Sequence, residues 1–167
     1  LSSAASSGGT NFGTGNFTME CWVYPTVTPG TNWIPIMSVG AIGGGQEIRI
    51  GQNINGTGKS GYLIPNNTNN ADVYSGVTTL TLNAWSHVAL VRNGSTVTYY
   101  VNGVSQGSTA SVSFNFTSTG NFLIGFDPYG ASDGYFPGYI TGVRVTKSAV
   151  YTGTFTVPTS QIGRAHV

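Results

Sequence analysis

Charged side chains are scarce in this chain of 167 residues. Six basic and five acidic residues make up 7% of it and leave a net charge of +1, whereas charged residues form about 25% of an average soluble domain. A nucleic-acid-binding protein or a polybasic membrane-surface protein needs clustered lysine and arginine, which this composition does not provide. The composition therefore excludes a nuclease, a histone-like protein and a coiled coil.

Cysteine, histidine and long apolar runs are also rare or missing. Cys21 is the only cysteine, so the fold cannot depend on an intrachain disulfide. His87 and His166 are the two histidines, too few to build a zinc site together with one cysteine. No apolar stretch approaches the ~20 residues of a transmembrane helix, and no long segment has helical periodicity. Hydrophobic residues still make up 39% of the chain, which excludes a disordered protein.

The residues that are present favour short β-strands separated by turns of Gly, Asn and Pro. The clearest pattern runs from Trp85 to Gly107, where alternating residues are interrupted by turns at Asn93-Gly94 and Asn102-Gly103. Further strands are expected over residues 16–24, 34–39, 46–51, 61–64, 77–82, 121–126 and 139–147. Many short strands with small polar turns indicate an all-β fold, a two-sheet antiparallel jelly-roll sandwich.

The strand over residues 16–24 shows which of its faces is buried. Its apolar positions, which we expect in the core, are Phe17, Met19, Cys21 and Val23. Glu20 and Trp22 lie on the opposite face. We expect Cys21 to be an inert buried thiol, and we also assign Trp22 and Trp85 to the core.

Four segments together resemble the concanavalin A-like lectin/glucanase superfamily, and within it the laminin-G-like domains of phage and bacterial surface proteins. They are residues 15–25 (GNFTMECWVYP), 85–92 (WSHVALVR), 99–103 (YYVNG) and 136–145 (FPGYITGVRV). Residues 149–159 resemble the last strand and exit of that family. The resemblance implies a concanavalin A-like sandwich, but it says much less about function, because this sandwich carries lectins, glycosidases, adhesion modules and spacers.

Both ends of the chain depart from the family pattern. The resemblance implies an opening strand before Leu1, so we expect residues 1–160 to form a single domain that lacks its first strand. Residues 162–167 (IGRAHV) resemble a translated sequencing-library adapter. We therefore expect residues 161–167 to be a non-native tail and the sequence to come from a metagenome.

Hydrolysis of a glycosidic bond normally requires two carboxylates that flank it. The hydrolases of the superfamily place them at alternating positions of one strand, and no two of the five acidic residues here have that spacing. A pair formed by Glu20 and Glu47 from separate strands stays open. We expect instead that Glu20 pairs with Arg92 or Arg144, because a buried charge needs a partner. The sequence thus predicts no catalytic residues.

The loop over residues 126–138 is the most informative candidate for a binding site. Asp127 and Asp133 offer the oxygen ligands that Ca²⁺ prefers, so a calcium site is predicted there. For carbohydrate binding the predicted residues are Trp33, Tyr129, Asp133 and Tyr135, because aromatic rings suit the apolar faces of sugars. The alternative is a turn-rich connection in which the aspartates cap backbone amides and the aromatics pack inward. The Asn102-Gly103 turn, where many family members have Asp-Gly, lacks one potential calcium ligand.

These observations predict a non-catalytic, lectin-like carbohydrate-binding domain of a larger phage or bacterial surface protein, used in glycan recognition or attachment. Its partner would be a glycan or cell-surface polysaccharide, with no nucleic acid and no membrane insertion. Its location would be extracellular, on a virion or a cell surface, where homo-oligomers or multivalent display would raise a weak single-site affinity. Two alternatives stay open: a structural or decoration domain that binds no glycan, and a degenerate glycoside hydrolase.

Overall fold

The computed structural model describes residues 2–3, 10–30, 32–41, 46–53, 56–65, 72–117, 120–126 and 134–159. Its strands are β1 (Ser2–Ser3), β2 (Phe17–Pro25), β3 (Ile34–Ala41), β4 (Gln46–Gln52), β5 (Ser60–Pro65), β6 (Asp72–Thr78), β7 (Ser86–Asn93), β8 (Thr96–Val101), β9 (Val104–Thr109), β10 (Phe122–Ile124) and β11 (Gly138–Thr146). In these ranges no helix is long and apolar enough to cross a membrane.

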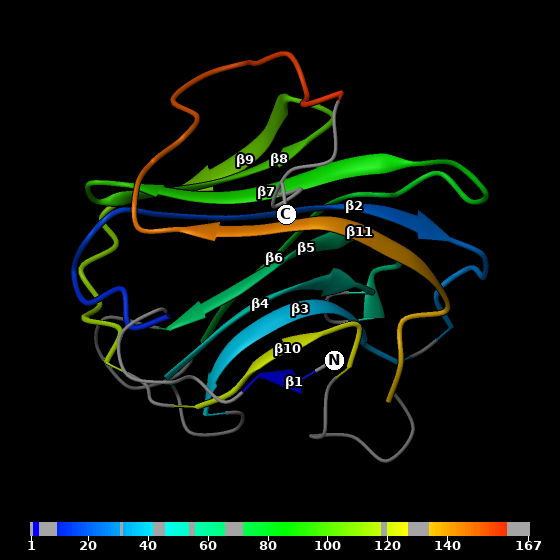
Figure 1. Ribbon diagram of the computed structural model, residues 1–167, viewed down its shortest axis with the longest axis horizontal. Coiled ribbons are helices and arrows are strands. Elements are labelled where there is room, and N and C mark those ends of the chain that lie inside the picture. The colour runs from blue at the N-terminus through cyan, green and yellow to red at the C-terminus, as the bar shows by residue number, and fades with distance from the viewer. Residues whose placement is uncertain are drawn as a thin grey trace, which may run out of the picture.

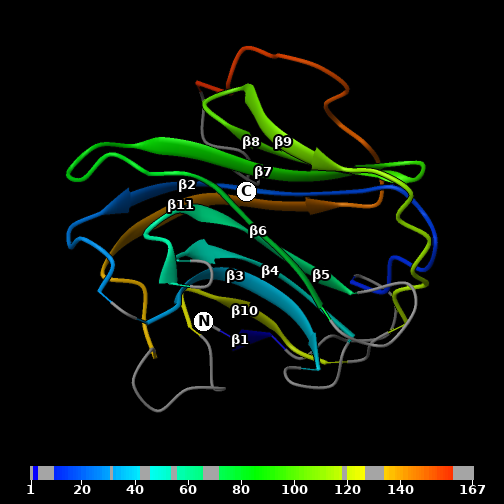
Figure 2. The ribbon, with the colours of Figure 1, turned by 180° about the vertical axis from the view of Figure 1, so that it is seen from behind.

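The strands form two antiparallel sheets that lie face to face (Figure 1). One sheet has six strands in the order β1-β10-β3-β4-β5-β6, and the other has five in the order β11-β2-β7-β8-β9. The same two layers are seen from behind in Figure 2. The all-β, two-sheet jelly-roll sandwich predicted from the sequence is confirmed.

The core fills the space between the sheets, because every second side chain of a strand points inward. The four apolar residues of β2 that were expected there are fully buried: Phe17, Met19, Cys21 and Val23. From the six-stranded sheet, Ile48 and Ile50 of β4 and Tyr62 of β5 meet them in the same core. Cys21 is a free, buried cysteine in the core, as expected, and burial raises the pKa of its thiol.

The meander expected from the turns of Asn and Gly is formed by β7, β8 and β9. Gly94 has a φ of +60°, Asn102 of +50° and Gly103 of +78°. These left-handed conformations are the ones that Asn and Gly adopt at little cost, so the dipeptides allow the chain to reverse between neighbouring strands.

After β11, residues 147–159 cross the outer face of the five-stranded sheet, and we call this segment the strap. It is the orange-to-red chain that arches over β7 and β8 in Figure 1. The Thr18 hydroxyl donates to the carbonyl of Ser148 at 2.8 Å, and the amide of Phe155 donates to the carbonyl of Gly103 at 3.0 Å. Tyr151 and Phe155 pack on Ala89, Val91 and Tyr100 in a second, smaller apolar cluster.

The assignment of two tryptophans to the core is wrong. Trp85 is 45% exposed, and Trp22 is half-buried on the outer face of β2, where its ring packs edge-on against His87. The reason is that successive side chains of a strand point to opposite faces of its sheet. Val88 and Leu90 point into the core, so the odd-numbered positions of β7 and the residue that precedes it point outward.

Several expectations fall on the ends of the chain. β1 pairs with β10 at the edge of the six-stranded sheet, with Ser2 opposite Leu123 and Ser3 opposite Phe122. Residues 4–9 and 160–167 lie outside the described residues. The predictions of a missing first strand and of a non-native tail at 161–167 therefore stay predictions.

Candidate functional site

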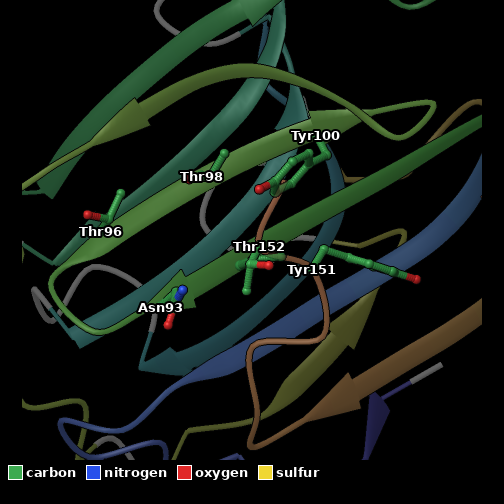
Figure 3. Close-up of a pocket in the computed structure, with 7 residues that line it drawn as sticks. Asn93, Thr96, Thr98, Tyr100, Tyr151 and Thr152 are labelled. Atoms are coloured by element: carbon green, nitrogen blue, oxygen red, sulfur yellow. The ribbon is translucent and has the colours of Figure 1, made fainter. Parts of the chain in front are cut away.

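A hollow of about 250 Å³ lies on the outer face of the five-stranded sheet, beside the strap. Its lining residues come from the end of β7, from β8 and from the strap: Val91, Asn93, Thr96, Thr98, Tyr100, Tyr151 and Thr152. Figure 3 shows the ring of Tyr100 pointing from β8 toward Thr152, while the ring of Tyr151 points away from Thr96 and Thr98. The hollow is therefore bounded by sheet on one side and by strap on the other.

Strand register explains why these side chains share one face. Asn93 lies opposite Thr96 and Val91 lies opposite Thr98 in the ladder that joins β7 to β8. Directly opposite residues of an antiparallel pair project to the same side of a sheet. Because Val97 and Tyr99 point into the core, Thr96, Thr98 and Tyr100 must point outward.

The lining carries hydroxyl and amide groups but no charged side chain. Threonine and tyrosine hydroxyls and the asparagine amide can each donate and accept hydrogen bonds. Asn93 and Thr152 are exposed, whereas Thr98 bonds through its hydroxyl to that of Ser108 at 2.9 Å. Such a lining can bind an uncharged ligand that has many hydroxyl groups.

A buried carboxylate next to the hollow holds the strap in place. Glu20 of β2 is fully buried, and the Tyr151 hydroxyl donates to its Oε2 at 2.7 Å. Arg144 of β11 donates through Nε to Oε1 of Glu20 and through Nη2 to the Tyr151 hydroxyl, the latter at 3.1 Å. Of the two arginines that the sequence offered as partners for Glu20, it is thus Arg144, and not Arg92, that binds it.

His87 completes this cluster. Its Nε2 lies 3.0 Å from Oε2 of Glu20, close enough for an ion pair, although the ring nitrogen is not aligned for a regular hydrogen bond. Burial on its own would raise the pKa of Glu20. The contacts with His87, Tyr151 and Arg144 outweigh burial and lower that pKa. Burial and the neighbouring Glu20 carboxylate raise the pKa of Tyr151 to about 12.

These contacts leave Glu20 poorly suited to acid catalysis, because a general acid at neutral pH requires a raised pKa. Glu47 cannot assist it either. Glu47 alternates with the core residue Ile48 on β4 and pairs with Arg49 at 2.7 Å, so it lies on the outer face of the other sheet. The two carboxylates lie on opposite sides of the sandwich and cannot flank one glycosidic bond, which removes the pair that the sequence had left open.

Two of the predicted binding residues lie in the described part of the chain. Trp33 is half-buried next to β4, and its ring lies so close to Gly51 that a Cβ there would come within 2.6 Å of the ring atom Cζ2. The guanidinium carbon of Arg49 lies 5.8 Å from the centroid of the same ring. Tyr135 is 78% exposed, and its ring packs on Phe126 with centroids 5.1 Å apart. Trp33 and Tyr135 do not line the hollow.

The other predicted site residues, Asp127, Tyr129 and Asp133, lie outside the described residues. Within the described ranges no group of three or more His, Cys, Asp or Glu side chains could hold a metal ion. The calcium site at Asp127 and Asp133 therefore stays a prediction.

None of the residues that line the hollow is among the binding residues predicted from the sequence. A signal was present, because Thr96, Thr98 and Tyr100 alternate with apolar residues and so form a polar outer face. That pattern alone is common on solvent-facing strands. Only the position of the strap, which adds Tyr151 and Thr152, turns this face into a hollow.

Solved structures of other proteins share the fold of this sandwich. Domain 4 of AbnA, a GH43 extracellular arabinanase from Geobacillus stearothermophilus solved with arabinotriose, has a TM-score of 0.61 and 17% identity, over 82% of this chain and 63% of that one. The CBM40 of a Ruminococcus gnavus IT-sialidase, bound to α2,3-sialyllactose, has a TM-score of 0.63 and 14% identity, over 84% of this chain and 80% of that one. The enzymatically active domain of tailspike protein 2 of bacteriophage CBA120 has a TM-score of 0.61 and 17% identity, over 82% of this chain and 23% of that one.

At these identities the likeness shows a shared fold. No curated protein sequence matches the chain. Residues 2–152 match the family described as Laminin_G_3, of the concanavalin A-like lectin/glucanases superfamily. That match covers most of the 167 residues and includes the segments that carried the resemblance. The chain therefore belongs to the Laminin_G_3 family of the concanavalin A-like lectin/glucanases superfamily.

Proposed function

We propose that this chain is a non-catalytic carbohydrate-binding domain of a phage or bacterial surface protein, and that the hollow beside the strap binds a glycan. The uncharged, hydroxyl-rich lining of the hollow carries this proposal. Structural neighbours that were solved with arabinotriose or sialyllactose support it, because the same sandwich serves glycan binding in those proteins.

The absence of charge in the lining predicts how binding depends on salt. Ion pairs at a protein surface weaken as salt rises, whereas hydrogen bonds between neutral groups depend little on ionic strength. Glycan binding in the hollow should therefore be nearly the same at low and high salt. A single hollow of this size makes few contacts, so affinity would come from several copies displayed together.

A glycan array probed with the whole chain tests the proposal, followed by calorimetric titration of the best glycan. Thr98→Val removes one lining hydroxyl with little change of shape, and Asn93→Ala removes an exposed amide. Each should weaken binding about 3- to 10-fold, the contribution of one hydrogen bond between neutral groups. Thr154→Val, on an exposed part of the strap outside the lining, is the matched control.

The outcome separates the proposal from its alternatives. An array without any bound glycan would favour a structural or decoration domain. Release of new reducing ends from laminarin-type glucans would show a glycoside hydrolase and contradict the non-catalytic role. If Thr98→Val and Asn93→Ala both bind the glycan as the wild type does, the glycan binds elsewhere on the domain.

A further inference from the structure

Three aromatic side chains form a row across one end of the five-stranded sheet, away from the hollow. Tyr24 of β2 lies directly opposite Tyr139 of β11, and Trp85 precedes β7 beside Tyr24. The ring centroids of Tyr24 and Trp85 are 5.4 Å apart, and those of Tyr24 and Tyr139 are 5.8 Å apart. We call Trp85, Tyr24 and Tyr139 the aromatic row.

The row is exposed, although the same face is covered nearby. Tyr139 is 64% exposed, Trp85 is 45% exposed and Tyr24 is half-buried. The next outward positions of β2 and β7 are Trp22 and His87, and His87 lies under Phe155 of the strap with ring centroids 5.8 Å apart. The strap therefore stops short of the row and leaves its rings open to solvent.

The rings are not needed to complete the fold. They lie outside both apolar clusters, and the main core is filled from the opposite face of the same strands. In the described part of the chain, the hydroxyls of Tyr24 and Tyr139 and the indole N–H of Trp85 have no hydrogen-bond partner. Large aromatic side chains that are exposed next to one another, unlike single exposed ones, mark interaction or ligand-binding sites.

We propose that the aromatic row is a second glycan-contact site, distinct from the hollow, that stacks uncharged pyranose units. This inference rests on the proposed carbohydrate-binding function and adds the site and the sugar class. Aromatic faces suit the apolar C–H faces of pyranose rings, and the free hydroxyl and indole groups can bond to sugar hydroxyls. The ring of Tyr24 meets that of Trp85 at an interplanar angle of 61° and that of Tyr139 at 62°, and these two rings lie on either side of it.

The chemistry around the row selects neutral sugars over acidic ones. None of the residues adjacent to the three rings in the sequence is charged, and this favours uncharged sugars over sugars with a carboxylate or sulfate, which bind best to a cation. A protein partner would need about 800 Å² of surface on this chain, and three side chains supply only part of that. Stacking of a sugar needs only the rings themselves.

Titration with neutral hexasaccharides of glucose (laminarihexaose, cellohexaose and maltohexaose), followed by tryptophan fluorescence and calorimetry, tests the inference. Binding should change the emission of the wild-type protein. Trp85→Ala and Tyr139→Ala should each weaken binding about 5- to 10-fold, as expected for the loss of one aromatic contact. Trp85→Phe, which keeps an aromatic face, should retain most of the affinity. Unchanged melting temperatures would show that the variants are folded.

The controls separate this site from the hollow. Thr98→Val should leave the row intact, so it should not alter the fluorescence change. If Trp85→Ala and Tyr139→Ala bind all glycans as the wild type does, the inference is overturned while the proposed function stands. If the wild type binds no glycan on the array or in titration, both fail. If the variants reduce only self-association in light scattering, the row is a protein contact and the inference is also overturned.

Discussion

Glu20 shows how a single buried charge is stabilised in a domain that has few charges. The carboxylate is fully buried, and it receives hydrogen bonds from Arg144 of β11 and Tyr151 of the strap. Burying an unpaired carboxylate would be very costly, so these partners are required for the fold to tolerate Glu20 at all. Since Arg144 is 31% exposed, part of its charge is still solvated.

Glu20→Gln should lower the free energy of unfolding by about 1.5–3 kcal/mol, the value of hydrogen bonds to a charged group. The loss should stay below that of a fully buried pair because water can still solvate Arg144. Chemical denaturation of the wild type and of Glu20→Gln measures this difference in the free energy of unfolding. Tyr151→Phe, which removes one hydroxyl only, should cost about 1 kcal/mol. An unchanged denaturation midpoint in both variants would show that the cluster does not fasten the strap.

The lowered pKa of Glu20 also predicts a dependence of stability on pH. The folded pKa lies below the ordinary value of 4.5, so ionised Glu20 favours the folded state. Its contribution is fully present above pH 4.5 and is lost as the pH falls below that value through the folded pKa. Melting temperatures should therefore fall more steeply with acid in the wild type than in Glu20→Gln. Parallel curves for the two proteins below pH 4.5 would contradict this.

Among the elements, the strap has the greatest influence on the candidate site. It forms one wall of the hollow, and it is held at one end by Thr18 and near the other by Gly103. The rings of Tyr151 and Phe155 stack in parallel with centroids 3.5 Å apart, and Phe155 also packs on Tyr100. Because these contacts fix the position of the strap, a change at one of them should alter the hollow.

The turn between β8 and β9 offers a test of the strap with a close control. Gly103 has a φ of +78°, and a Cβ there would collide with the carbonyl oxygen of Phe155. Gly94 has a φ of +60° with nothing within 4 Å of such a Cβ. Both alanine substitutions should cost about 1–2 kcal/mol through the left-handed backbone. Gly103→Ala should cost more and displace the strap.

Thermal denaturation and limited proteolysis of the strap compare these two variants. Faster cleavage within residues 147–159 in Gly103→Ala than in Gly94→Ala is the expected result. Equal stability and equal cleavage would show that the carbonyl of Phe155 can move aside at no cost. Glycan binding in the hollow should also weaken in Gly103→Ala, because Tyr151 and Thr152 move with the strap.

Arg92 is a buried cation whose hydrogen bonds, within the described part of the chain, go to backbone carbonyls. Its guanidinium donates to the carbonyl of Phe114 at 2.9 Å and to that of Gly94 at 3.1 Å. Its carbon Cζ also lies 4.5 Å from the centroid of the Phe114 ring. The planar fork of arginine suits several carbonyls at once. Arg92 thus joins the β7–β8 turn to the chain after β9.

At the scale of the whole molecule, the predicted calcium site links stability to the concentration of Ca²⁺. If Asp127 and Asp133 share a calcium ion, Ca²⁺ binds only the folded chain and should raise the melting temperature by mass action. A concentration 100 times the dissociation constant would add about 2.7 kcal/mol. Asp133→Ala should lose this response, and Asp72→Ala should keep it. Identical melting curves in calcium and in chelator would contradict the prediction.

The sequence by itself determined the class of the fold. Alternation with a period of two places Met19 and Cys21 in the core whatever the strand pairs with, and Asn102-Gly103 favours a tight turn through local backbone preferences. The same alternation, continued from β7 to the residue before it, places Trp85 on the outer face. These features depend on residues that are close together in the chain, so they can be predicted from the sequence alone.

The partners of the polar groups and the shape of the site were decided only by the tertiary structure. Glu20 and Tyr151 are 131 positions apart, and nothing local indicates whether Arg92 or Arg144 reaches the carboxylate. The hollow needs the strap to lie over β7 and β8, and the aromatic row needs three strands in register. Such contacts depend on which strands become neighbours, and the packing of two sheets settles that for the chain as a whole.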